Sequence, residues 1–95
     1  MPRPKKHRHC QCKMTGQVFK PTGTPLCDLE KIEVAADELE ALRLCDLEGL
    51  AQEQAGQRMG VSRGTVQRLL ASARKKITRA LVSGAALVFA AAGGD

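Results

Sequence analysis

The chain has 95 residues, 43% of them hydrophobic, and its 15 Lys and Arg against 10 Asp and Glu give a formal net charge of +5. This length suffices for one small domain with a three- or four-helix core, but it is too short for an enzyme with a deep, closed pocket. The positive charge favours a polyanionic partner, and two Phe without Trp or Tyr argue against single-stranded nucleic acid, which is bound by stacking on aromatic rings.

Residues 1–25 are expected to form a basic arm that is flexible or loosely packed. This stretch holds all four prolines and both histidines and has no acidic residue. Its first residues lack the apolar segment of a secretory signal. The longest apolar run, 85–92, falls well short of the roughly 20 residues that a membrane-spanning helix needs. We therefore expect a cytoplasmic protein without a transmembrane segment.

The arm also carries possible ligands for a transition metal. His7, His9, Cys10 and Cys12 lie within six residues, and Cys27 is a further candidate. Imidazole and thiolate suit zinc, copper(I) or iron, but ligands this crowded do not follow a zinc-finger spacing. A basic arm with incidental cysteines and no cofactor is the alternative. Without an export signal, the cysteines are expected to be reduced or metal-bound rather than paired in disulfides.

A short strand and a helix are predicted next along the chain. After a Pro/Gly turn at 21–25, the segment KIEV at 31–34 alternates apolar and charged residues, as a half-buried strand does. The segment 37–49 predicts a helix with Asp37 as N-cap, Glu40 completing a capping box and Gly49 as the stop. Within it, Cys45 is expected to be a small buried core residue. The carboxylates around it are interpreted as solvated faces and caps: Glu38, Glu40, Asp46, Glu48 and Glu53.

Two further helices are expected to form a helix-turn-helix. The first spans 50–59 and is closed by Gly60, and the second is capped by Ser62 and runs to about residue 81 or 82, before Ser83 and Gly84. A steep crossing needs a small residue where the two backbones approach, and Gly56, four residues before the turn glycine, stands at that position. Residues 85–95 are expected to form an apolar tail or a strand.

The second of these helices has one apolar and one basic face. At about 100° per residue, a single apolar stripe predicts core positions at Val66, Leu69, Leu70, Ala73, Ile77 and Ala80. No acidic residue occurs between Glu53 and Asp95. A helix that carries basic residues and no acidic ones suits the phosphates of DNA. The alternative is a solvated basic helix of a small bundle.

The geometry of B-DNA assigns expected roles, because the major groove admits an α-helix whose first turns reach the base edges. Contacts to phosphates at the helix N-terminus are expected from Ser62 and Thr65. Base contacts are expected from Arg63, Gln67 and Arg68, and further phosphate contacts from Arg74, Lys75, Lys76 and Arg79.

Three runs of the sequence resemble a known family. They are FKPTGTPL at 19–26, DELEALRLCDLEGL at 37–50 and MGVSRGTVQRLLASARKKI at 59–77, behind the start MPRPKK. They are similar to small prokaryotic proteins of the domain-of-unknown-function family numbered one hundred thirty-four. The resemblance covers nearly the whole chain and implies a DNA-binding protein with a helix-turn-helix like region four of sigma-seventy factors. Gly64, where the family usually has a long polar residue, and the ligand-rich HRHCQC segment depart from its pattern.

The expected fold is therefore a mainly α-helical, sigma-like three-helix core over 26–84, without a wing and with one or two short strands. The expected function is sequence-specific binding of double-stranded DNA in transcription regulation. Catalysis is not expected, because both histidines lie in the arm and no P-loop or dinucleotide motif occurs. A metal- or redox-responsive module using HRHCQC and a protein-interaction adaptor of the transcription machinery are the alternatives.

A homodimer or higher homo-oligomer is also expected, because one short recognition helix reads only a few base pairs. The segments KIEV at 31–34 and ALVF at 86–89 are the candidate contacts. Their pairing, within one chain or between two, would bury Ile32, Val34, Leu87 and Phe89 together.

Overall fold

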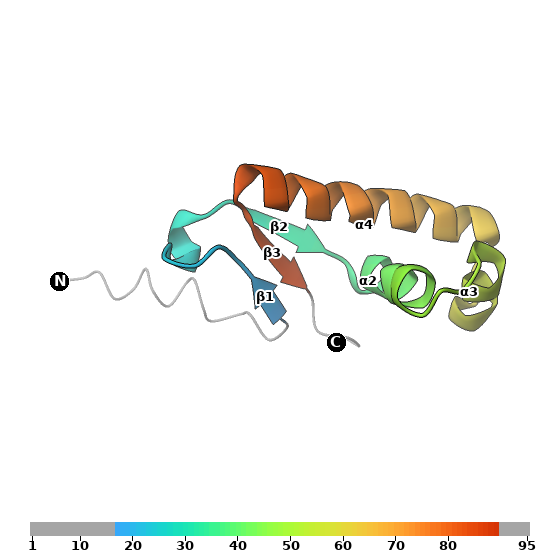
Figure 1. Ribbon diagram of the computed structural model, residues 1–95. Helices are drawn as coiled ribbons and strands as arrows, with labels where there is room; N and C mark the ends of the chain where they lie inside the picture. Colours follow the sequence, from blue (N-terminus) through green and yellow to red (C-terminus); the bar gives the residue numbers. More distant parts are fainter. Residues whose placement is uncertain (1–16, 90–95) are drawn as a thin grey trace.

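A computed structural model of the chain describes residues 17–89. In this part of the chain the fold is mainly α-helical with one small sheet, in agreement with the predicted fold class (Figure 1). In chain order, the elements are β1 (Gln17–Phe19), a 3-10 turn η1 (Leu26–Asp28), β2 (Lys31–Val34), α2 (Ala36–Leu42), a π-helical turn η2 (Arg43–Leu47), α3 (Gln52–Met59), α4 (Arg63–Ser83) and β3 (Ala86–Phe89).

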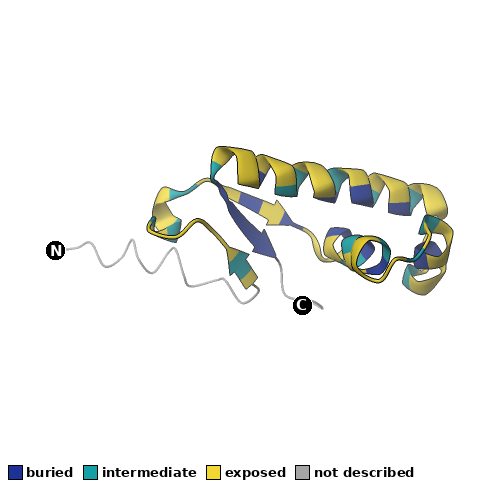
Figure 2. Ribbon diagram, in the orientation of Figure 1, coloured by how far each residue is buried: buried dark blue, intermediate teal, exposed yellow. Residues whose placement is uncertain are grey.

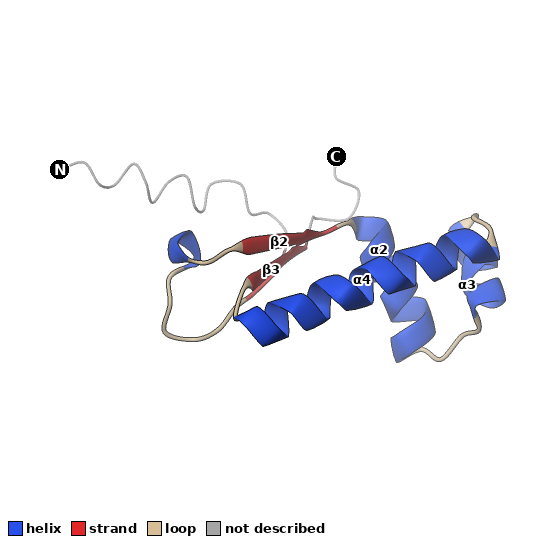
Figure 3. Ribbon diagram, turned by 90° about the horizontal axis from the view of Figure 1, so that it is seen from above, coloured by secondary structure: helices blue, strands red, loops and turns tan. Residues whose placement is uncertain are grey.

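The long helix α4 organises the molecule. Helices α2 and α3 pack on its first half, and the sheet packs on its second half (Figures 1 and 3). The predicted apolar stripe is confirmed, because Val66, Leu70, Ala73 and Ala80 are buried. Leu69 packs against the core cluster shared with α2 and α3, and Ile77 against the cluster shared with the sheet. Figure 2 shows the consequence: the side of α4 that faces the other elements is buried and its outer side is exposed.

Strand β3 is the centre of the sheet, with the order β1-β3-β2. It runs parallel to β2, as two strands joined by a helical crossover do. Ile32 lies opposite Leu87 and Val34 opposite Phe89, and all four are buried in one cluster with Ala80 of α4. The predicted pairing of KIEV with ALVF is thus confirmed, and it occurs within one chain.

Part of the stretch expected to be a loosely packed arm belongs to the sheet. Residues 17–19 form β1, which pairs antiparallel with β3. The Phe19 ring meets the Phe89 ring edge-on, with 5.7 Å between the centroids. A strand of three residues is too short to produce a visible alternation in the sequence. For the same reason, the described fold has three strands where one or two were expected.

Two predicted helix starts are displaced. Helix α2 begins at Ala36, where the Ala35 amide donates to Oε1 of Glu38 at 2.8 Å; the prediction of Asp37 as N-cap with Glu40 as its partner is wrong. Because β2 ends at Val34, only one residue separates strand from helix. Helix α3 begins at Gln52 rather than at residue 50, and the Leu50 amide bonds to the Leu44 carbonyl at 2.9 Å instead.

The predicted glycine stops are confirmed. Gly49 follows η2 with φ +81°, and Gly60 and Gly84 close α3 and α4 in the left-handed conformation, with φ +75° and +74°. This conformation favours glycine because a Cβ atom makes it strained. Helix α4 extends through Ser83, one or two residues beyond the expected end.

Candidate nucleic-acid interface

Helices α3 and α4 are joined by a turn of three residues, Gly60 to Ser62. The Val61 amide donates to the Gly56 carbonyl at 2.9 Å. A Cβ atom added to Gly56 would lie 2.7 Å from the Val61 carbonyl oxygen, closer than real Cβ contacts allow. Gly56 is therefore the small residue that the crossing requires, as predicted, and the chain forms a helix-turn-helix.

The start of α4 is fixed by two hydroxyl side chains. Ser62 is the N-cap, and its Oγ accepts a hydrogen bond from the Thr65 amide at 3.1 Å, as predicted. The Ser62 and Thr65 hydroxyls also bond to each other at 3.0 Å. The Arg68 guanidinium donates to the Thr65 hydroxyl at 3.5 Å. These contacts hold Arg68 against the first turn of the helix, whose amides and dipole favour an anion.

The outer side of α4 is exposed and basic from Arg63 to Lys75. Arg63, Gln67, Arg68 and Lys75 are all exposed. Within residues 17–89, none of the three cations among them forms an ion pair. Gly64 lies on the same side, and a Cβ there would meet nothing closer than 3.9 Å, so the position has room for a larger side chain.

Two other cations of α4, Arg74 and Arg79, are held by exposed carboxylates. Arg74 binds Asp46 through both ends of its fork, with Nε–Oδ2 at 3.0 Å and Nη2–Oδ1 at 2.6 Å. Arg79 binds Glu30 at 2.8 Å. The hydrogen bond and the charge of Arg74 lower the pKa of Asp46, against a smaller opposing effect of burial. Asp46 is exposed, in agreement with its interpretation as part of a solvated face, and it also holds Arg74.

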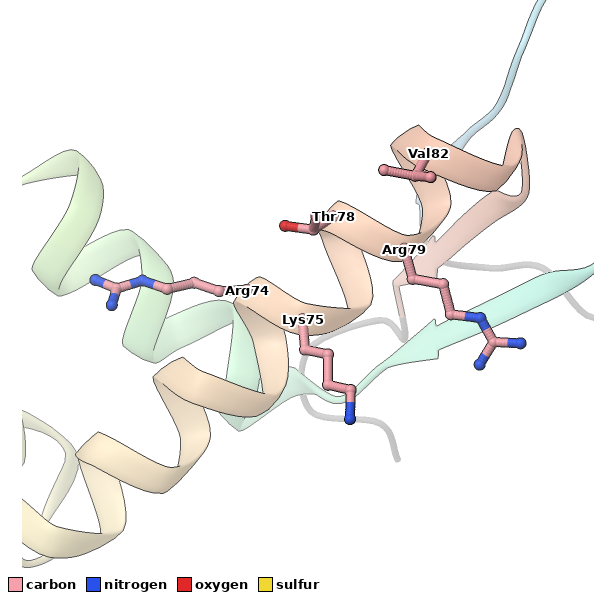
Figure 4. Close-up of a pocket in the computed structure, with 5 residues that line it drawn as sticks. All are labelled: Arg74, Lys75, Thr78, Arg79 and Val82. Carbon is pink, nitrogen blue, oxygen red and sulfur yellow. The ribbon is translucent and has the colours of Figure 1, made fainter.

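A shallow surface hollow of about 540 Å³ is lined by Arg74, Lys75, Thr78, Arg79 and Val82. Figure 4 shows these five side chains. Arg74 and Arg79 extend to opposite sides of α4, each toward its own carboxylate, and Lys75 extends between them. The unpaired Lys75 thus lies between two cations whose charge is already balanced.

Lys76 has a different role from its neighbours. Its ammonium group donates to Oε1 of Glu38 at 2.7 Å and to the Glu33 carbonyl at 2.9 Å. Ser72 donates to the other oxygen of Glu38, which is only 6% exposed. The expectation of a solvated Glu38 is wrong, because the helix crossing brings Lys76 and Ser72 over it.

The pKa of Glu38 reflects two opposing effects. Burial raises it, but the hydrogen bonds from Lys76, Ser72 and the Ala35 amide, with the charge of Lys76, outweigh burial and leave the pKa below its ordinary value. Glu38 is thus a charged carboxylate held inside the fold. Ser72 and Lys76 lie 34 and 38 residues away in the sequence, so no local spacing predicts these two partners.

The predicted metal ligands His7, His9, Cys10 and Cys12 lie outside the described residues. From residue 17 to residue 89, no group of three His, Cys, Asp or Glu side chains is placed to hold a metal ion. Cys45 is free and partly buried against the α2–α3–α4 cluster, so its predicted core position is confirmed in part. Cys27, the further candidate ligand, lies in η1. No helix in 17–89 is sufficiently long and apolar to span a bilayer.

The fold and this surface define a small, mainly α-helical protein built around a helix-turn-helix with a basic second helix. The profile of the family described as "Protein of unknown function DUF134" matches residues 1–95. The chain belongs to this family. No solved structure matches the chain.

Several relatives are about 50% identical to this chain over the aligned residues, and each is named as a UPF0251 protein. The relative from Shewanella pealeana is 50% identical over 88 residues, which cover 93% of this chain and 92% of the relative. The one from Vibrio parahaemolyticus is 48% identical over 89 residues, which cover 94% and 93%. The one from Desulforudis audaxviator is 51% identical over 87 residues. The chain spans 57% of that last protein's length.

Proposed function

We propose that the protein is a cytoplasmic transcription regulator that binds double-stranded DNA through α3 and α4, in the manner of region four of sigma-seventy factors. One observation carries this proposal. The outer side of α4 presents Arg63, Arg68 and Lys75 to solvent, and no described carboxylate pairs with them. In a solvated helix of a bundle, by contrast, basic residues are commonly balanced by neighbours, as Arg74 and Arg79 are here.

The proposed roles follow from the position of each residue along α4, counted from its N-terminus. In the major groove, the first turns of α4 reach the base edges. Arg63, Gln67 and Arg68 are the base readers in this proposal, because Arg pairs bidentately with guanine and Gln with adenine. Phosphate contacts come from Ser62 and Thr65 at the N-terminus and from Lys75 farther along.

The remaining cations of α4 have lesser roles. Lys76 is not a primary phosphate ligand, because its ammonium group is bound to Glu38 and to the Glu33 carbonyl. Arg74 and Arg79 reach a phosphate only by leaving Asp46 and Glu30. No catalytic step and no cofactor enter this proposal.

The active species in this proposal is a homodimer. ALVF is the central strand β3, paired on both edges, and KIEV pairs with it inside the chain, so the pairing of these two segments is not the contact between chains. Leu81 and Val82 are 78% and 82% exposed at the end of α4 that lies away from α3. A symmetric contact there would leave the first half of both α4 helices open to DNA.

The test is selection of bound sequences from a random pool of double-stranded DNA with the full chain, followed by titration of the selected and scrambled sites at several salt concentrations. The proposal expects an enriched motif and an affinity that falls steeply with salt, because cations that bind phosphates release counterions. An unenriched pool, with no salt-dependent binding, would support the protein-interaction adaptor instead.

A further inference from the structure

Three carboxylates from one part of the chain hold three cations of α4. Glu30 binds Arg79, Glu38 binds Lys76 and Asp46 binds Arg74. The three pairs differ in accessibility. Glu38 is buried beneath Lys76, whereas both partners of the other two pairs are exposed by 41% or more of their side chains. Only the exposed pairs can open without disturbing the core.

The Asp46–Arg74 pair is the one nearest to the proposed DNA surface. Arg74 precedes the unpaired Lys75 directly, while Arg79 lies more than one helical turn beyond it, toward the sheet. Arg74 also has a side-chain exposure of 55%. A phosphate contacted by Lys75 would therefore lie within reach of the Arg74 side chain once Asp46 releases it.

The chemistry of the pair matches that of a DNA phosphate. Asp46 accepts from Nε and Nη2 of Arg74, each with its own oxygen. The guanidinium fork binds carboxylate and phosphate in this same two-pronged geometry. An exposed ion pair is weak, so the phosphates of a duplex are able to compete for Arg74.

On the basis of the proposed DNA binding, we propose that Asp46 binds Arg74 in place of a phosphate and thereby limits the sequence-independent affinity for DNA. The position of Asp46 on η2 makes this possible, because η2 lies beside α4 without covering its outer side. Since phosphate contacts do not read sequence, the limit applies equally to the selected site and to random DNA.

The experiment compares four forms of the full chain: the parent, Asp46→Asn, Arg74→Ala and the double variant. Their affinities for the selected site and for random duplex DNA are measured from about 50 to 300 mM salt, within the range where counterion release is observed. Glu48→Gln is the matched control. It removes the same charge two residues away, from a carboxylate that pairs with Arg43 instead of Arg74.

Asp46→Asn is expected to bind both DNAs about three- to tenfold more tightly at 0.1 M salt, with a log–log salt slope steeper by about one. In the Arg74→Ala background, Asp46→Asn should change the affinity by less than about twofold, because the released side chain is absent. Glu48→Gln should leave the slope unchanged. Melting curves check that every variant folds.

If the parent binds DNA and Asp46→Asn binds it no more tightly, the inference is overturned and the proposed function stands. The same holds if the gain persists in the Arg74→Ala background or is equalled by Glu48→Gln, since the cause would then be net charge alone. If neither the parent nor Asp46→Asn binds DNA, both the inference and the proposed function are refuted.

Discussion

Glu38 of α2 and Lys76 of α4 form an ion pair of 2.7 Å at the junction between the two halves of the fold. Lys76 also reaches the Glu33 carbonyl of β2, and Ser72 completes the bonding of the carboxylate. Three elements are thus joined at one buried charge. Removing one partner leaves the other buried and unsatisfied, which is more costly than the loss of a surface pair.

The first prediction concerns this pair. Lys76→Ala should lower the free energy of unfolding by about 2 to 4 kcal/mol, because Glu38 loses its counter-charge inside the fold. Lys75→Ala is the matched control. It removes the neighbouring cation, which is exposed and unpaired in the described chain, and should cost no more than about 0.5 kcal/mol. Urea unfolding at pH 7 measures both, and equal losses would contradict the role given to Lys76.

The same carboxylate predicts a dependence on pH. The pKa of Glu38 in the folded state lies below its ordinary value. At pH values near these two pKa values, the unfolded chain therefore binds more protons than the folded chain. The stabilisation that Glu38 contributes to the fold is present above the ordinary glutamate pKa of about 4.3. It is lost as the pH falls through the lower pKa of the folded state. Urea unfolding from pH 7 down to pH 3 should show a shallower acid-induced loss in Glu38→Gln than in the parent. Parallel curves would show that Glu38 is not responsible.

Two glycines of the helix-turn-helix should respond oppositely to the same substitution. Gly56→Ala should destabilise by about 1 to 3 kcal/mol, because its Cβ would lie 2.7 Å from the Val61 carbonyl oxygen. At Gly64 an added Cβ would make only ordinary contacts, the nearest at 3.9 Å, so Gly64→Ala should stabilise α4 by up to about 1 kcal/mol through helix propensity. Thermal unfolding of the two variants decides this, and a Gly56→Ala variant as stable as the parent would refute the close approach.

The prediction for oligomeric state rests on the end of α4. Replacing Leu81 and Val82 together by Ser should shift the protein to a monomer at micromolar concentration. The monomer's stability should change little, because both side chains are mostly exposed. Sedimentation measures the state. A parent that is already a monomer, or a double variant that stays dimeric, would contradict this surface.

Much of the fold follows from patterns within short stretches of sequence. The glycine stops at Gly60 and Gly84, the Ser62 cap and the apolar stripe of α4 each depend on neighbouring residues, and each is found in the structure. The strand KIEV was recognisable because Ile32 and Val34 alternate with charges. Strand β1 was not, because three residues give no period and its pairing with β3 joins residues about 70 positions apart.

The candidate site was only partly predictable for the same physical reason. The exposure of Arg63, Gln67 and Arg68 follows from helical geometry alone. Helical geometry does not show which cations are paired with a carboxylate, because Arg74, Lys76 and Arg79 meet their partners 28 to 49 residues away. The sequence alone predicts a solvated Glu38, because its burial depends on the crossing of α2 and α4.

The most direct test of the proposed DNA binding compares Arg68→Ala with Lys75→Ala on a selected duplex and on random DNA. Arg68→Ala should cost roughly 1 to 3 kcal/mol on the selected site and little on random DNA, because Arg68 reads a base. Lys75→Ala should weaken both by about the same factor and reduce the salt slope by about one, because it contacts a phosphate. If both variants bind both DNAs as the parent does, α4 is not the DNA-reading helix.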